Sequence, residues 1–316
     1  MMLLRAARLC SGGFILTVLL AFAGCASLPP VAITGSGFPR QFELVETAFF
    51  PQEEFQCGPA ALATVLADAQ VRVAPENLVA EIYLPERQGS LQAELIGATR
   101  RYDRVPYILA PDITAVLREV VAGHPVLVLQ NLGLSWIPQW HYAVVIGFDL
   151  DTQELVLRSG MEARHVVSLA TFERTWARAQ HWAFVVAPAD EVPASATERS
   201  FIEAVATLET QRRYSAAIHG YQAALQRWPN SVLARFGLAN SAFGQHDDVR
   251  AEREYRALLI QLPGNAAAWN NLAHVLLRQG RCTEAEAAAQ QAVKLGWATE
   301  AAARNTLREI RARSCQ

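Results

Sequence analysis

The stretch that decides the fold is Phe50-Pro-Gln-Glu-Glu-Phe-Gln-Cys-Gly-Pro-Ala-Ala-Leu-Ala-Thr-Val-Leu66. Its apolar residues Leu62, Val65 and Leu66 have helical spacing, and Gly-Pro just before them is typical of a helix start. The pattern therefore predicts a helix that begins at Cys57. Amide N–H groups and the dipole at a helix N-terminus favour a thiolate, so we expect a reactive cysteine. Taken alone, a cysteine beside a helix is more often a small buried apolar residue, and the rest of the chain must decide.

A second informative stretch lies well beyond Cys57 and runs Trp140-His-Tyr-Ala-Val-Val-Ile-Gly-Phe-Asp149. His141 opens a β-branched apolar run, which predicts a central strand with the imidazole at its end. Similar runs predict further strands at 125–131, 154–159, 165–169 and 182–187, with a short helix over 170–179. This order predicts an antiparallel sheet on which the helix bearing Cys57 packs.

Taken together, the two stretches resemble the bacteriocin-processing, double-glycine leader peptidases, which are papain-like cysteine peptidases. The motifs that carry the resemblance are Gln-x4-Cys-Gly-Pro-Ala-Ala-Leu and His-Tyr-Ala-Val-Val-Ile-Gly, within residues 48–187. The resemblance implies an α+β papain-like domain at 41–188, with Cys57 as nucleophile and His141 as base. It also implies that Gln52 donates its side-chain amide to the oxyanion hole. Gln56 is a competing donor, but its place next to the nucleophile on a turn is poor.

The third member of the family's site is an Asp on the strand after the histidine. Asp149 lies eight residues along the same strand as His141, which is roughly 26 Å at about 3.3 Å per residue. A hairpin places the position opposite His141 near 159–162, which makes Ser159 the expected partner, with Glu162 and Asn131 as alternatives. A serine hydroxyl accepts the imidazole N–H but lacks the charge that stabilises imidazolium. The sequence thus leaves open a degenerate, non-catalytic site.

The N-terminal segment 1–24 has the layout of a secretory signal, with Arg5 and Arg8 followed by a run, 14–23, that is apolar apart from Thr17. That run is too short to span a bilayer, which needs about 18 apolar residues. It ends at Phe-Ala-Gly-Cys25, which resembles the lipobox of bacterial lipoproteins and implies acylation of Cys25. An ordinary signal peptide is the alternative.

Residues 25–40 follow the lipobox and are expected to form a tether. Acyl chains on Cys25 would hold the protein at a membrane surface. Ala26, directly after the acylated cysteine, resembles the sorting signal of Gram-negative lipoproteins for the outer membrane, which implies a place on its periplasmic face.

Charge divides the mature chain in two. Residues 25–190 contain 11 basic and 18 acidic residues, a balance of −7, whereas residues 191–316 contain 15 basic and 12 acidic residues, a balance of +3. The two parts meet at the Pro- and Ala-rich segment 189–197, which predicts an interdomain linker.

The second part repeats at a constant interval, in two series: Ala217, Ala251, Ala285 and Tyr221, Tyr255, Ala289. The interval matches the period of about 34 residues that is typical of the tetratricopeptide repeat (TPR). This resemblance predicts an all-α solenoid over 198–316, in which about three repeats fill 198–297 and a capping helix follows from 300 to 313. The concave face of such a solenoid commonly holds a partner protein. A plain helical bundle is the alternative.

Cys282 falls at the start of the second helix of the third repeat, and Cys315 falls at the end of the capping helix. Neighbouring antiparallel helices bring those two ends together, so a disulfide is expected in an oxidising compartment. Two unrelated free thiols are the alternative.

Composition excludes several classes of protein. With 52% apolar and 18% charged residues and a net charge of −2, the 316-residue chain is neither disordered nor a typical nucleic-acid binder. No metal-ligand spacing or phosphate-binding loop is present, so we expect no cofactor. The sequence predicts a membrane-anchored cysteine peptidase that cleaves a peptide or protein substrate. A non-catalytic peptide-binding lipoprotein, or an acyl or isopeptide transferase that uses the same thiol, is the alternative.

Overall fold

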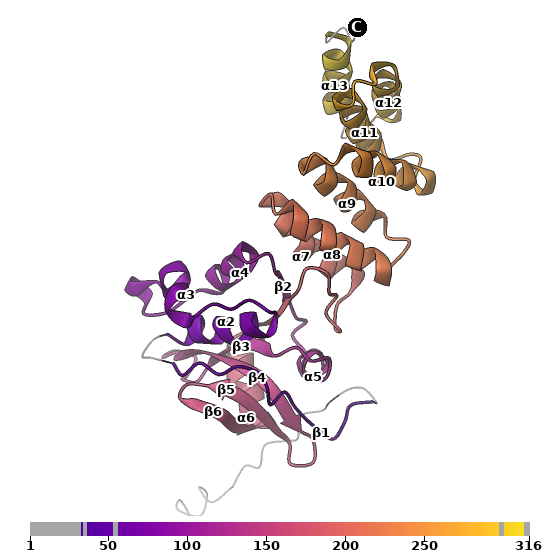
Figure 1. Ribbon diagram of the computed structural model, residues 1–316. Helices are drawn as coiled ribbons and strands as arrows, with labels where there is room; N and C mark the ends of the chain where they lie inside the picture. The colour runs from indigo at the N-terminus through magenta and orange to yellow at the C-terminus, as the bar shows by residue number, and fades with distance from the viewer. Residues whose placement is uncertain (1–32, 34–36, 53–55, 297–299, 313–316) are drawn as a thin grey trace, which may run out of the picture.

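The computed structural model describes residues 33, 37–52, 56–296 and 300–312. A sheet with helices on both faces comes first in the chain, and a curved stack of helices leads away from it to the C-terminus (Figure 1). The predicted signal segment, Cys25 and Cys315 lie outside the described residues.

The sheet is antiparallel throughout, in the order β2-β7-β3-β4-β5-β6, and β1 also pairs with β4. Its strands are β1 (Gln41–Glu43), β2 (Val105–Ile108), β3 (Val126–Asn131), β4 (Trp140–Asp149), β5 (Glu154–Ser159), β6 (Glu162–Ser168) and β7 (Ala183–Ala187). Together with the helices on its faces, this sheet confirms the predicted α+β class. Strands β1 and β2 were not predicted from the sequence, because β1 is very short and Pro106 interrupts the apolar pattern of β2.

Alternation along the strands divides the core of the domain into two layers. In β3, Leu127 and Leu129 pack in the cluster under helices α2 to α4, whereas Val126 and Val128 pack with α5 and α6 on the other face. The helices of this domain are α2 (Cys57–Asp68), α3 (Pro75–Ile82), the 3₁₀ helix η1 (Pro85–Arg87), α4 (Gln92–Arg101), α5 (Ile113–Val121) and α6 (Leu169–Ala177). The layer under α2 is the one that positions the candidate site.

The helical part repeats at the spacing that the sequence predicts. Its helices are α7 (Glu198–Thr210), α8 (Tyr214–Arg227), α9 (Val232–Gly244), α10 (Asp248–Gln261), α11 (Ala266–Arg278), α12 (Cys282–Leu295) and α13 (Glu300–Ala312). Helices α7, α9, α11 and α13 begin at 198, 232, 266 and 300, which is the same constant interval as in the sequence. The repeating alanines and tyrosines of α8, α10 and α12 are all buried, at 0–1% exposure: Ala217, Tyr221, Ala251, Tyr255, Ala285 and Ala289. This arrangement confirms the predicted TPR solenoid.

The first repeat packs directly on the edge of the sheet. Residues of α7 and α8 belong to the same apolar cluster as β2 and α5, and the Tyr107 and Ser200 hydroxyls lie 2.8 Å apart. The segment between the two parts is held as well, because the carboxylate of the fully buried Glu119 accepts hydrogen bonds from the backbone N–H groups of Ala194 and Ser195. The solenoid therefore has a fixed attachment to the sheet domain.

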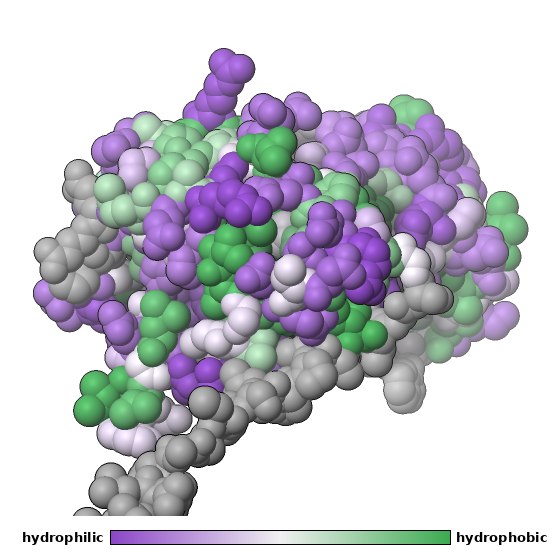
Figure 2. Space-filling view, turned by 90° about the horizontal axis from the view of Figure 1, so that it is seen from below, coloured by the Kyte–Doolittle hydropathy of each residue, from purple (hydrophilic) through white to green (hydrophobic). Residues whose placement is uncertain are grey.

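Seen from below, hydrophilic residues cover most of the molecule, and hydrophobic residues form separate groups between them (Figure 2). Among the residues that the structure describes, none of the helices combines the length and the apolar character needed to cross a bilayer.

Candidate active site

Cys57 opens helix α2, as the sequence predicts, and it is the free cysteine of the described residues. Its neighbour Gly58 is buried against the loop that precedes α4. A Cβ atom on Gly58 would lie 2.7 Å from Ser90 Oγ, so only glycine permits this contact. The buried helix and the close loop fix the position of the thiol.

His141 lies near the start of β4, where it pairs with Gln130 of β3. Its Nε2 atom is 2.8 Å from Oγ of Ser159, the last residue of β5. The structure therefore makes the contact that the hairpin register predicts. Since Ser159 occupies Nε2, the Nδ1 atom is the nitrogen that remains to exchange a proton with a thiol.

The other candidates for the third position have different partners. Asp149 caps a turn, since its Oδ1 accepts hydrogen bonds from the N–H groups of Asp151 and Thr152. The Glu162 carboxylate lies 3.3 Å from Nδ1 of His165.

Asn131 shapes the β3–β4 loop instead of the site. Its side-chain oxygen accepts the N–H groups of Gly133 and Gln139. This loop exposes Trp136 and Ile137, at 75% and 67%, to solvent. Trp140, the first residue of β4, lines the pocket.

Gln52 and Ser159 are positioned by a shared turn. The backbone N–H of Gln52 donates to the carbonyl of Gly160 at 3.2 Å, and Gly160 directly follows Ser159. Gly160 has a φ of +59°, a conformation that glycine adopts without strain. One turn thus holds both the partner of His141 and the chain segment that carries Gln52.

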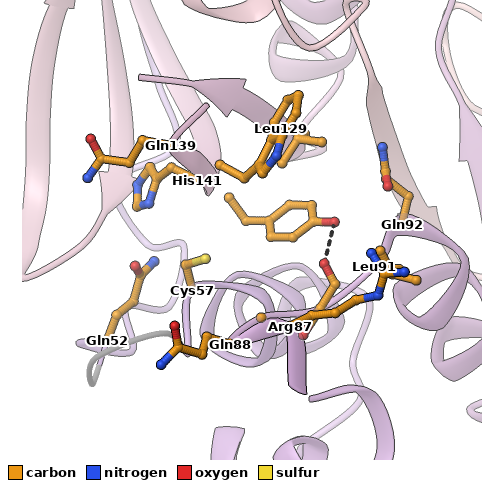
Figure 3. A pocket seen from close by; sticks show the side chains of 13 residues that line it. Gln52, Cys57, Arg87, Gln88, Leu91, Gln92, Leu129, Gln139 and His141 are labelled. Atoms are coloured by element: carbon orange, nitrogen blue, oxygen red, sulfur yellow. Dashed lines mark hydrogen bonds between the residues drawn. The ribbon is translucent and has the colours of Figure 1, made fainter. Parts of the chain in front are cut away.

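Three of the candidate residues line one pocket of about 780 Å³. Gln52, Cys57 and His141 line it, whereas Gln56, the competing oxyanion donor, is not among its described lining residues. Figure 3 shows Gln52, Cys57 and His141 together on one side of the pocket. The Tyr142 hydroxyl donates to the Ser90 carbonyl at 3.1 Å, and this bond joins β4 to the loop on the other side.

Burial keeps the thiol and the imidazole neutral. It raises the pKa of Cys57, and backbone N–H groups of Tyr142, Gly58 and Cys57 lower that pKa by less. Burial also lowers the pKa of His141, and the nearby charge of His165 acts in the same direction. The helix N-terminus thus acts on the thiol in the direction that the sequence predicts, but desolvation has the larger effect on the pKa of Cys57.

The remaining sequence expectations concern cysteines and metals. Cys282 is disulfide-bonded, but its predicted partner Cys315 lies outside the described residues, so that pairing stays a prediction. Within the described ranges, His, Cys, Asp and Glu form no group of three or more suited to a metal ion.

The chain matches two family models. Residues 45–184 match the Peptidase_C39 like family, and residues 206–266 and 250–303 match a tetratricopeptide repeat model. No curated protein matches the chain.

Solved structures resemble each part separately. A C39-like peptidase from Bacillus anthracis is 18% identical, with a TM-score of 0.41, and the match covers 47% of this chain and 98% of that one. The peptidase domain of Streptococcus ComA, a bi-functional ABC transporter, is 17% identical, with a TM-score of 0.37 and coverage of 45% and 99%. The Yersinia enterocolitica type III secretion translocator chaperone SycD is 16% identical, with a TM-score of 0.36 and coverage of 39% and 89%. The chain thus combines a Peptidase_C39-like domain at residues 45–184 with tetratricopeptide repeats over residues 206–303.

Proposed function

We propose that this chain is a membrane-anchored cysteine peptidase that hydrolyses a peptide bond through Cys57 and His141. The observation that carries the proposal is the shared pocket, in which Cys57, His141 and Gln52 meet while Ser159 binds Nε2 of the imidazole. A nucleophile and a base that is oriented by a third group are the parts that acyl transfer requires.

The reaction starts from a neutral pair, because burial raises the pKa of Cys57 and lowers that of His141. His141 Nε2–H donates to Ser159, and Nδ1 accepts the thiol proton as Sγ attacks the peptide carbonyl. The S–C bond forms, the C–N bond breaks, and Nδ1 passes its proton to the leaving amine. Water, deprotonated by His141, then hydrolyses the thioester and restores the thiol.

The tetrahedral intermediate carries a negative oxygen that needs donors. The side-chain amide of Gln52, which lines the pocket, and the backbone N–H of Cys57 at the start of α2 would supply them. Loss of one such donor costs roughly 10²–10³ in rate.

The other parts of the chain would bring substrate and enzyme together. The TPR helices supply a surface for a substrate or partner protein. Acylation at Cys25 would place the protein at the periplasmic face of the outer membrane. Because α7 packs on β2, a protein held by the first repeat would keep one position relative to the pocket.

Covalent labelling tests the catalytic pair. A peptide-aldehyde or iodoacetamide probe is incubated with wild type, Cys57→Ala, His141→Ala and the surface control His219→Ala. We expect labelling at Cys57 that falls about 10²-fold or more in His141→Ala, the usual contribution of a positioned base, and stays unchanged in His219→Ala. Labelling that does not depend on His141 would count against a catalytic pair.

A non-catalytic binding protein is the second candidate, and a specific observation favours it. Ser159 brings no charge to His141, and burial opposes both charged forms, so the site lacks the groups that usually stabilise the ion pair. Full function of Cys57→Ala in cells would establish this candidate. A transferase shares the first half-reaction and is recognised by an amine adduct in place of a free acid.

A further inference from the structure

The far side of the pocket is formed by a rigid turn. Helix η1 leads into Gln88, which has a φ of +47°, and Leu84 and Gly89 pair across the turn through the Leu84 N–H, 2.8 Å from the Gly89 carbonyl. The bond from Tyr142 to the carbonyl of Ser90 fastens this turn to β4. The backbone of residues 84–90, which we call the rim turn, is therefore held in a fixed position at the pocket.

The rim turn contributes the charge of the pocket. Among the lining residues that the structure describes, Arg87 is the one with a fixed charge. The other polar side chains of the lining include the amides of Gln52, Gln88, Gln92 and Gln139. A cleft lined by amides and one guanidinium binds a carboxylate in preference to a cation.

The side chain of Arg87 is also available to bind a ligand. This side chain is exposed, and within the described part of the chain it makes no hydrogen bond or ion pair. In Figure 3, Arg87, Leu91 and Gln92 lie toward one side of the pocket, and Gln52 and His141 lie toward the other. A substrate that reaches both sides would place its reacting carbonyl at Cys57 and a different group at Arg87.

We propose that Arg87 is the carboxylate subsite of this cleft, so that the preferred substrate is a peptide with a carboxylate held at Arg87 while its scissile bond lies at Cys57. This inference rests on the proposed function and names its substrate class. The carboxylate comes from an Asp or Glu side chain or from the free C-terminus of the peptide. The preference is local, because residues 25–190 carry a net charge of −7 and do not attract acidic peptides at long range.

Hydrolysis of paired peptides tests the subsite. One series exchanges Asp for Asn, and Glu for Gln, at each position of a quenched fluorescent peptide, and a second compares a free C-terminal acid with its amide. We expect kcat/KM to be about tenfold higher for the acid at one position, the size of a charge-assisted hydrogen bond of about 1.4 kcal/mol. The series that shows the preference identifies the source of the carboxylate.

Variants assign the preference to Arg87. Arg87→Gln removes the preference, Arg87→Glu transfers it to Lys peptides, and Arg72→Gln, an exposed arginine outside the pocket, leaves it intact. Equal rates for acid and amide at every position, or a preference that persists in Arg87→Gln, would overturn the subsite.

Binding of the same peptides to Cys57→Ala, measured by fluorescence anisotropy, separates this inference from the proposed function. Acid-selective binding that Arg87→Gln abolishes, without cleavage by wild type, supports the subsite and refutes the peptidase. Cleavage without acid selectivity does the reverse.

Discussion

A carboxylate placed at position 159 should convert the neutral pair into an ion pair. Ser159 Oγ lies 2.8 Å from Nε2 of His141, so Ser159→Asp puts a negative charge in contact with the imidazole. An opposite charge at such a distance shifts a pKa by about one to three units. Because Ser159 is only half-buried, solvent screens part of this effect, and we take the lower end.

One unit is worth about 1.4 kcal/mol in favour of imidazolium, which is a tenfold change in equilibrium. The new charge opposes the burial that lowers the pKa of His141. Imidazolium in turn stabilises the Cys57 thiolate, the form that alkylating reagents attack. We therefore expect Ser159→Asp to react with iodoacetamide about ten times faster than wild type at pH 6.

The assay is the second-order rate constant of Cys57 alkylation between pH 5 and 10, read by intact-protein mass. Ser159→Asn controls for the size of the new side chain without its charge. Asp149→Asn controls for a carboxylate that caps a turn away from the site. A Ser159→Asp profile that superimposes on that of Ser159→Asn would refute the contact as a control on the chemistry of His141.

Three further positions give predictions of their own: two lie around the site, and one lies where the sheet domain meets the solenoid. Gly160→Ala forces a φ of +59° on a residue with a Cβ, so it should cost about 1–2 kcal/mol in denaturant unfolding and slow Cys57 labelling; unchanged labelling would contradict the shared turn. Gly58→Ala places a Cβ 2.7 Å from Ser90 Oγ and should displace the rim turn, so peptide binding measured by anisotropy should weaken while calorimetry still shows a folded protein. Unaltered binding would count against the close contact. Burial lowers the pKa of His124, but its hydrogen bonds to Glu119 and Glu191 raise that pKa to about 9. Its stabilising charge, worth about 3 kcal/mol, is thus complete below about pH 6.5 and lost as pH rises through 9. The difference in unfolding free energy between wild type and His124→Gln should shrink from pH 7 to 10; a constant difference would refute it.

The sequence was informative where short-range pattern determines structure. The β-branched run after His141 predicts β4, and the hairpin register predicts the contact of Ser159 with His141, because strand pairing across a short turn is a local property. The constant interval between the repeating alanines predicts the solenoid, since each repeat packs only against its neighbours.

Contacts between distant residues were not predictable in this way. Glu119 lies in the amphipathic α5 and has no local signal of a partner, yet it binds the backbone N–H groups of Ala194 and Ser195, far along the chain. The rim turn has the composition of an ordinary solvent-exposed turn, and contacts with residues far along the chain place it at the pocket: the bond from Tyr142 to Ser90 and the close approach of Gly58 to Ser90.

The balance of charge at the thiol also depended on tertiary structure. The helix start before Gly58 correctly indicated N–H groups near Cys57. How far the fold desolvates the thiol is not written in the local sequence, and desolvation decides the direction of the pKa.

Trapping of the acyl-enzyme tests the central claim most directly. The protein is mixed with an activated peptide ester, quenched in acid, and measured by intact mass and peptide mapping. The account predicts a burst of about one equivalent of alcohol, a thioester on Cys57, and its turnover to free acid in wild type but not in His141→Ala. A wild-type protein that releases no burst and carries no acyl group on Cys57 would contradict it.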